Sequence, residues 1–483
     1  MEIIILLALP LSGALALALC GAHRRAAELN VAISLASFAV AVLLSVRVIR
    51  DGTQLCCAEQ FFVDPFNVFL VTLTAFVNLT TAVFSRRYMR IEQHHGRLGN
   101  AQLRLYHCLY QLFMFTMLLA LLSNNMGLLW VAMEAATLST VLLVSLYRTP
   151  ASLEAAWKYF ILCGVGIALA LFGTILLYFA AERVLGHAGT DALLWTQLEA
   201  VKGQLEPTVL AIAFVFLLIG YSTKAGFAPL HNWLPDAHAE GPTPVSAVLS
   251  GLLLNVALYA VIRCKVLVEG SIRSELPGRM LMFFGIASVL VGALMLWRQK
   301  DIKRLFAYSS IEHMGIIGFA FGMGGAVANF AALLHMTVHS LTKSAIFFAA
   351  GHAVQAAGSQ QMSEIRALLG TSPALGWGLM LAALAILGMP PFGVFTSEFL
   401  ILLTAMREHT WTTALLLPAL GMAFAAIFWR TQEMVFGEPT GARLALAPAL
   451  TPVFVHLALV LLLGLWIPPF LAEWYRLAAR MIG

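Results

Sequence analysis

The sequence has little charge for its length. Of its 483 residues, only 11% are Asp, Glu, Lys or Arg, whereas 60% are hydrophobic. A water-soluble domain needs more charge to cover its exterior, so this composition excludes an ordinary soluble protein. The net charge of +5 does not indicate nucleic-acid binding either, because the basic residues are divided among many short polar segments.

Motifs of common cofactor sites are missing as well. The six cysteines contain no Cys-x-x-Cys spacing, which argues against iron–sulfur or zinc ligation. Cys56 and Cys57 are adjacent in an expected loop, where small residues in a turn are the simplest interpretation. The sequence has no phosphate-binding glycine loop and no dinucleotide fingerprint. We therefore expect no cofactor, no metal and no nucleic acid on this chain.

Long apolar runs are what the sequence does have. Each of them can cross about 30 Å of hydrocarbon, and they predict an all-α integral membrane protein with about fourteen transmembrane helices. The first run lacks a basic leader and an obvious cleavage site, and we interpret it as a retained helix. The runs are about 2–21, 28–49, 65–88, 105–124, 126–148, 153–181, 208–236, 244–267, 278–297, 302–322, 325–350, 374–406, 411–436 and 451–474.

The distribution of basic residues predicts an orientation. The segment 85–106 is especially rich in arginine. Cytoplasmic segments of membrane proteins carry an excess of Lys and Arg, so we expect this segment to face the cytoplasm and both termini to face outward. Its arginines are Arg86, Arg87, Arg90, Arg97 and Arg104.

Two lysines lie inside apolar runs. Lys224 stands in Gly-Tyr-Ser-Thr-Lys-Ala-Gly-Phe-Ala-Pro (220–229), and Lys343 lies in the run 325–350. An ammonium at membrane depth costs several kcal/mol and by default marks an ion or proton path. The residues expected to break the helix around Lys224 are Gly220, Gly226 and Pro229.

Glu134 is the natural partner for Lys224. It lies in the middle of an apolar run with no cation beside it. A lone carboxylate there is protonated or needs a partner on another helix. A Glu134–Lys224 pair could hold or release a proton according to its neighbours. The alternative is a fixed salt bridge that only locks two helices together, which is a poor source of stability at this depth.

A second row of titratable groups contains His335, His339 and Lys343. The spacing i, i+4, i+8 places them on one helical face over about 12 Å, and Glu312 lies one helix earlier. Because histidine titrates near neutral pH, such a row can pass protons through water. Two rival interpretations remain: zinc ligation by His335 and His339, or core histidines satisfied by their neighbours.

A second interrupted helix is expected at 388–393, where Gly-Met-Pro-Pro-Phe-Gly precedes Glu398. Irregular backbone at membrane depth is tolerated where it is buried or lines a watery cavity. Two interrupted helices in corresponding places suggest inverted repeats with sites at the breaks. The expected organisation is three N-terminal helices (1–104), two five-helix half-channel repeats (105–267 and 278–436) and a C-terminal helix (451–483).

Three motifs together resemble a known family over roughly residues 60–460. They are Lys-Ala-Gly-Phe-Ala-Pro-Leu-His-Asn-Trp-Leu-Pro-Asp-Ala-His from Lys224, Gly-Pro-Thr-Pro-Val-Ser-Ala from Gly241, and Asp-Ile-Lys-Arg-Leu-Phe-Ala-Tyr-Ser-Ser from Asp301. The family comprises the antiporter-like proton-translocating subunits of respiratory complex I, Mrp cation antiporters and membrane-bound hydrogenases. Within it, the chain most resembles component F of hydrogenase-4, of the formate hydrogenlyase type.

The resemblance implies roles in proton translocation for particular residues. Glu134 matches the fifth-helix glutamate that pairs with Lys224, and Glu398 matches a carboxylate on the second broken helix. One position departs from the pattern, because Asn255 stands where members often carry a lysine or histidine on the eighth helix. Asn255 cannot titrate, so the halves must be linked through water, His231 or another helix. The residues given a role are Glu134, Lys224, His231, Glu312, His335, His339, Lys343 and Glu398.

The function implied by the resemblance is that of a proton-translocating subunit in a redox-driven complex of the membrane-bound hydrogenase type. The chain would lie in a bacterial or archaeal cell membrane and would carry no redox site and no catalytic residue. Other membrane subunits and peripheral nickel–iron hydrogenase and iron–sulfur subunits would be its partners. The alternatives are an Mrp-type cation/proton antiporter subunit, an NADH-quinone oxidoreductase membrane subunit, or a purely structural anchor. The ionisable positions inside the spans argue against the anchor.

Overall fold

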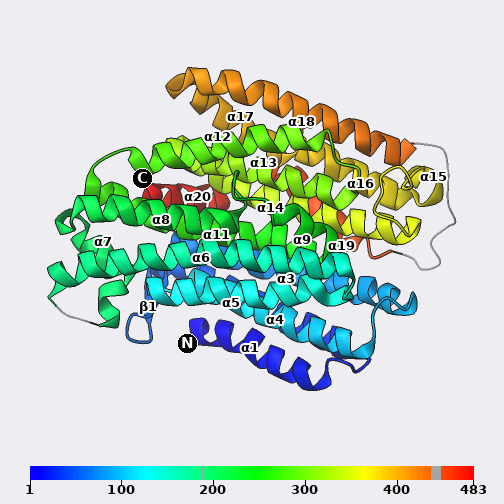
Figure 1. The fold of residues 1–483 in the computed structure, drawn as a ribbon, viewed down its shortest axis with the longest axis horizontal. Coiled ribbons are helices and arrows are strands. Elements are labelled where there is room, and N and C mark those ends of the chain that lie inside the picture. Colours follow the sequence, from blue (N-terminus) through cyan, green and yellow to red (C-terminus); the bar gives the residue numbers. More distant parts are fainter. Residues whose placement is uncertain (187–188, 437–447) are drawn as a thin grey trace.

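The computed structural model describes residues 1–186, 189–436 and 448–483, and nearly all of this chain is helical (Figure 1). The one sheet in the described residues is a short antiparallel hairpin of β1 (Gln54–Cys56) and β2 (Phe61–Val63), in which Gln54 pairs with Val63. The all-α membrane architecture expected from the apolar runs is confirmed.

The first half of the chain forms eight long or medium α-helices and several short turns. The helices are α1 (Glu2–Cys20), α2 (Ala26–Asp51), α3 (Pro65–His94), α4 (Asn100–Leu122), α5 (Met126–Val144), α6 (Pro150–Leu185), α7 (Trp195–Val201) and α8 (Pro207–Ala225). The turns are η1 (Ser145–Tyr147), η2 (Thr190–Leu193) and η3 (Lys202–Gln204).

The middle of the chain contains short helices around the first break and then long buried ones. These are α9 (Leu234–Glu240), α10 (Thr243–Val248), the π-helical turn η4 (Leu249–Leu253), α11 (Leu254–Ile272), α12 (Leu276–Leu296), α13 (Ile302–Met323) and α14 (Gly325–Ala357). The last helices are α15 (Leu368–Thr371), α16 (Pro373–Ile386), α17 (Gly393–Glu408), α18 (Thr410–Phe436), α19 (Thr451–Leu465) and α20 (Pro469–Ile482).

Local sequence signals start several of these helices. Asp64 caps α3 by accepting hydrogen bonds from the backbone nitrogens of Phe66 and Asn67, and Asn67 reaches back to the nitrogen of Asp64. This reciprocal arrangement satisfies backbone donors that the first turn leaves free. The Thr149 hydroxyl caps α6 by accepting a single hydrogen bond from the backbone nitrogen of Ser152.

Ten helical segments in the described ranges are long and apolar enough to cross a membrane, or eleven if α19 and α20, which meet at 79°, count as one span. The other three predicted runs also form helices, but they do not pass this test. α13 and α14 carry many polar side chains, and the third run is divided into α16 and α17, of 14 and 16 residues. The expected number of fourteen is therefore higher than the number of uniformly apolar spans.

Both predicted breaks are present. α8 ends at Ala225, and α16 ends at Ile386, seven residues before α17 begins. Gly226 adopts φ +79°, and Phe227 donates to the carbonyl of Ser222, which closes α8 as glycine commonly closes a helix.

The prediction that Gly220 breaks the helix is wrong. α8 runs through Gly220, where a Cβ would lie 2.6 Å from the carbonyl oxygen of Gly166 on α6. Here glycine serves close helix packing rather than interruption, because its missing side chain lets two backbones approach.

α14 lies at the centre of the second half. Every residue from 331 to 355 is buried, and the helix packs against α13, α16, α17, α19 and α20. Its 33 residues span about 50 Å, so this one helix is longer than the hydrocarbon layer of about 30 Å is thick.

Both chain termini lie at the same end of the bundle (Figure 1), which agrees with their expected placement on one side of the membrane.

Candidate functional site

Lys224 lies at the buried end of α8. Its side chain is 1% exposed, and it belongs to the last turn before the break at Gly226. Helix C-termini carry a partial negative charge that favours a cation. The break therefore gives a buried ammonium a favourable place without requiring a direct carboxylate contact.

Thr137 bridges Lys224 and Glu134. The ammonium of Lys224 donates a hydrogen bond to the Thr137 hydroxyl. That hydroxyl has one proton, which can go to the carboxylate oxygen Oε2 of Glu134 at 3.4 Å or to the carbonyl of Met133 at 3.2 Å. The expected pair is thus brought together through one side chain on α5.

An aromatic residue of α6, Tyr159, lies beside this pair. Nζ of Lys224 lies 5.5 Å from the centre of the Tyr159 ring, and the Tyr159 hydroxyl shares a 2.8 Å hydrogen bond with Thr140 on α5. Such a ring face attracts a cation and keeps water away from it. Glu134 itself is only half-buried, so it forms the more accessible member of the pair.

The segment after the first break leads towards α13. The Trp233 indole donates to the carbonyl of Thr223 at 2.8 Å, an oxygen at the end of α8 that also accepts from the backbone nitrogen of Gly226 at 3.3 Å. His231 is 7% exposed, and its ring lies 6.2 Å from that of Tyr308 on α13. His231 therefore lies beside the second half and is not part of the Glu134–Lys224 contact.

Polar but non-titrating side chains lie between the two halves. Asn255 on α11 donates to the Ser340 hydroxyl on α14 at 2.7 Å, and Ser340 donates to the carbonyl of Gly251 at 2.7 Å. Gly251 belongs to the π-helical turn η4, a geometry that is frequent at functional sites. Asn255 thus contacts the helix that carries Lys343.

Lys343 is completely buried on α14 and donates to the carbonyl of Phe306 on α13 at 3.1 Å. Ser310 donates to the same carbonyl at 3.0 Å and shares a 2.7 Å hydrogen bond with Ser250 at η4. The Lys343 ammonium is therefore bound by a neutral carbonyl oxygen. It lies in a polar seam between the two halves, which we define as Ser250, Asn255, Ser310 and Ser340.

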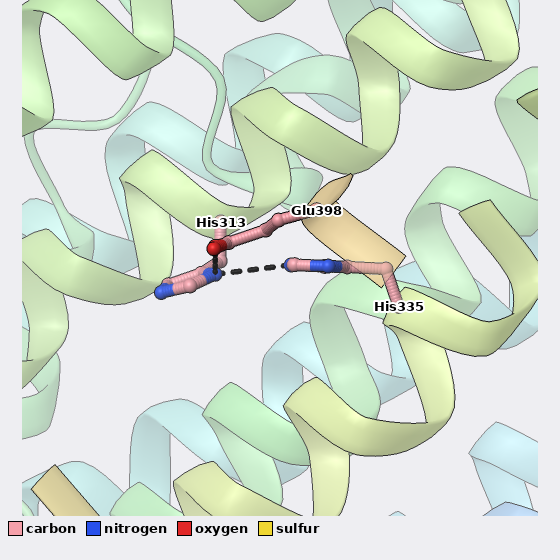
Figure 2. Close-up of side chains that lie close together, drawn as sticks. All are labelled: His313, His335 and Glu398. Atoms are coloured by element: carbon pink, nitrogen blue, oxygen red, sulfur yellow. Dashed lines mark hydrogen bonds and ion pairs between the residues drawn. The ribbon is translucent and has the colours of Figure 1, made fainter. Parts of the chain in front are cut away.

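Three side chains from three helices converge around His335, at the opposite end of the His335–His339–Lys343 row from Lys343 (Figure 2). Nδ1 of His313 on α13 lies 3.0 Å from Nε2 of His335 on α14 and 3.7 Å from Oε1 of Glu398 on α17. His335 also contacts the Ser397 hydroxyl through Nδ1 at 2.9 Å. The ring of His339 lies beside that of His313, tilted by 34° with a centroid separation of 5.6 Å.

One cavity adjoins these groups, and another lies at the opposite end of α14. A small one of about 30 Å³ is lined by Glu312, His313 and Glu398 together with apolar side chains of α16 and α18. A larger one of about 360 Å³ lies at the opposite end of α14, with Glu240, Lys303 and other polar residues in its wall. Both are large enough to hold water.

Two contributors were missed by sequence reasoning. The sequence did not indicate a role for Thr137, because the hydroxyl of a threonine in an apolar helix most often donates a hydrogen bond to a backbone carbonyl of the same helix. His313 follows Glu312 directly, so the Glu-His pair could have indicated it. Of the predicted residues, the structure brings Glu134 near Lys224 and His335 near Glu398, whereas His231 remains separate from both groups.

The chain is similar to membrane subunits of known complexes. A family model described as "NADH:quinone oxidoreductase/Mrp antiporter, TM" matches residues 123–423, a range that contains every predicted site residue. The sequence is 50% identical over 467 residues to the hydrogenase-4 component F homolog of Methylacidiphilum infernorum (isolate V4), and the match covers 97% of each chain.

Two solved structures share the fold. A chain of the membrane-bound sulfane sulfur reductase, an archaeal respiratory membrane complex, matches 100% of this chain and 98% of its own length, with a TM-score of 0.89 at 24% identity. A chain of the Mrp complex from Dietzia sp. DQ12-45-1b matches 99% of this chain and 96% of its own length, with a TM-score of 0.85 at 20% identity. These likenesses concern the arrangement of helices.

Proposed function

Because the chain belongs to the NADH:quinone oxidoreductase/Mrp antiporter family of multi-pass membrane proteins, we propose that it translocates protons as a subunit of a redox-driven hydrogenase complex of the hydrogenase-4 type. The extensive similarity to a hydrogenase-4 component F homolog favours this complex over an Mrp-type antiporter or an NADH-quinone oxidoreductase.

The observation that carries the proposal is the pair of buried ammonium groups with polar side chains between them. Lys224 is tied to Glu134 through Thr137, and Lys343 contacts α13 within a seam that includes Asn255. Buried charges are expensive and persist in membrane proteins where they serve transport. A purely structural subunit gives no reason for two such lysines.

The proposed path begins at Glu134 and Lys224. A charge change next to the half-buried Glu134 would alter how strongly Lys224 holds its proton, because coupled groups titrate together. Thr137 would transmit the change, since its single hydroxyl proton serves either Glu134 or the carbonyl of Met133. Proton release from Lys224 would then follow the break towards the second half.

The second part of the path runs along α14. Protons would pass from the seam at Asn255 to Lys343 and then by way of His339, His313 and His335 to Glu398. Several buried atoms on this route or near it have no hydrogen-bond partner among the described residues, and water is the ordinary partner for such atoms. They are His231 Nδ1, Asn255 Oδ1, Glu312 Oε2 and both ring nitrogens of His339.

The proposed organisation assigns one half-channel to each five-helix segment. Residues 105–267 would form the first repeat around the break at Gly226, and residues 278–436 the second around 388–393, with inverted topology. The redox chemistry would reside in peripheral nickel–iron hydrogenase and iron–sulfur subunits, and this chain would contribute proton transfer and contacts to other membrane subunits.

Affinity purification through a tag on this chain tests the assignment to a complex. We expect hydrogenase large and small subunits to co-purify, and we expect the purified assembly in vesicles to acidify or alkalise the lumen when its redox reaction runs. Co-purification with cation-antiporter subunits alone, and sodium-dependent rather than redox-dependent proton movement, would point to the Mrp-type function.

A further inference from the structure

From the arrangement in Figure 2 we propose that His313, His335 and Glu398 form a binding site for a divalent first-row transition-metal ion of the Zn²⁺ class. The three residues come from α13, α14 and α17. The site differs from a zinc site made by His335 and His339, because its ligands are on separate helices and include a carboxylate.

The distances suit a tetrahedral ion. Ligand atoms about 2.0–2.1 Å from zinc lie about 3.3 Å from each other. The observed separations are 3.0 Å between the two imidazoles and 3.7 Å between His313 and Glu398, and all three ligand atoms lie within 4.8 Å of one another. Small side-chain rotations bring them onto one ion, and water in the adjoining cavity of about 30 Å³ completes the fourth position.

The hydrogen bonds of Ser397 prepare His335 as a ligand. When the Ser397 hydroxyl donates to the carbonyl of Val394 at 2.9 Å, its oxygen can accept a proton from Nδ1 of His335. In that tautomer Nε2 of His335 carries the lone pair that faces His313, and Nδ1 of His313, which then donates the 3.0 Å hydrogen bond, gives up its proton when the ion binds. Metal-binding histidines commonly have such a partner on the other ring nitrogen, which fixes the tautomer and the ring direction.

Glu312 places a second carboxyl group beside the proposed site, and this group would be ionised when a divalent ion is bound. Its side chain is 2% exposed and lines the same cavity as His313 and Glu398. Its Oε2 has no hydrogen-bond partner in the part of the chain described by the structure. The charge of two ionised carboxylates beside two neutral imidazoles balances that of a divalent ion. Glu398 is the most exposed of the three ligands, with 14% of its side chain accessible, so we propose that the ion enters past Glu398.

An ion at this position would tie three helices together and replace the contact between His313 and His335. Only this inhibitory consequence rests on the proposed function, because the proposed path uses the same two imidazoles. Bound zinc should then stop proton transfer without displacing any subunit.

Binding is measured first, on the intact purified complex equilibrated with Zn²⁺. We expect the wild type to hold one more zinc ion than His313→Gln or Glu398→Gln, with imidazole and oxygen ligands in zinc X-ray absorption. Ser397→Ala keeps all three ligands and should weaken binding about 10–100-fold. His339→Gln is the matched control and should retain the ion.

Equal zinc content in the wild type and in both ligand variants would overturn the site. Loss of zinc in His339→Gln with retention in His313→Gln would assign the ion to the His335–His339 pair and would also overturn it. Since each ligand variant is tested separately, the comparison remains decisive if one of them fails to assemble.

Proton flux into vesicles is measured second. Ser397→Ala should raise the zinc concentration that halves the flux by about 10–100-fold. Zinc that binds through the three ligands but leaves the flux unchanged would support the metal site and contradict the proposed route through it.

Discussion

Lys224 reaches Glu134 through the hydroxyl of Thr137 rather than by a direct ion pair within 4 Å. The two charged groups are therefore coupled by a neutral side chain whose single proton has two possible acceptors. A direct salt bridge would hold both charges firmly, whereas this arrangement lets the interaction change when one hydroxyl proton turns.

Replacement of the Thr137 hydroxyl should uncouple the pair. Thr137→Val keeps the shape of the side chain but leaves the Lys224 ammonium without this partner, which should destabilise the chain by about 1–3 kcal/mol and slow proton transfer. Thr137→Ser retains the hydroxyl and should behave nearly as the wild type. Thermal unfolding of the assembled complex and proton flux in vesicles measure both effects, and equal flux in the two variants would contradict the bridging role.

Removal of either charge should be partly compensated by removal of the other. Glu134→Gln leaves a buried ammonium without its countercharge, and Lys224→Met leaves a carboxylate without its partner. In the double variant the stability loss should be smaller than the sum of the single losses, with a coupling of about 0.5–3 kcal/mol. Proton transfer should be lost in all three. Additive losses in a double-mutant cycle would mean that the residues do not interact.

Lys343 should need a releasable proton and not merely a positive charge. In Lys343→Ala the methyl group of alanine is easier to bury than the ammonium group of lysine, so the complex should assemble while proton transfer stops. Lys343→Arg keeps the charge but cannot release its proton and should fail as well. Normal flux in the arginine variant, measured with a pH-sensitive dye, would exclude Lys343 as a proton carrier.

The arginine-rich segment 85–106 should face the cytoplasm. In a variant without native cysteines, the exposed positions His95 and Thr53 lie beyond opposite ends of α3. His95→Cys should react only with reagent that has access to the cytoplasm, and Thr53→Cys with an impermeant reagent added outside. The reverse labelling pattern would invert the topology.

The charged members of the site can be predicted from the sequence because a charge within an apolar run is costly to bury and by default marks a functional position. Lys224, Lys343 and Glu398 were identifiable for this reason, and Gly226 was identifiable as a helix end. The bridging role of Thr137 and the contacts of His313 with His335 and Glu398 could not be predicted, since they depend on which helices pack side by side. Gly220 was misassigned because a glycine that permits close packing and one that ends a helix look the same in sequence.

The π-helical turn η4 holds a spare residue between α10 and α11. It accommodates one residue more than an α-helical turn, so deletion of one residue within Leu249–Leu253 would convert it into an ordinary turn and leave α11 near its present rotation. Asn255 would then keep its contact with Ser340. Arg263 would keep Asp64, with which it forms a buried 2.7 Å ion pair. A single widened turn therefore lets the chain change its length by one residue while two distant contacts stay in phase, one between the halves and one at the start of α3.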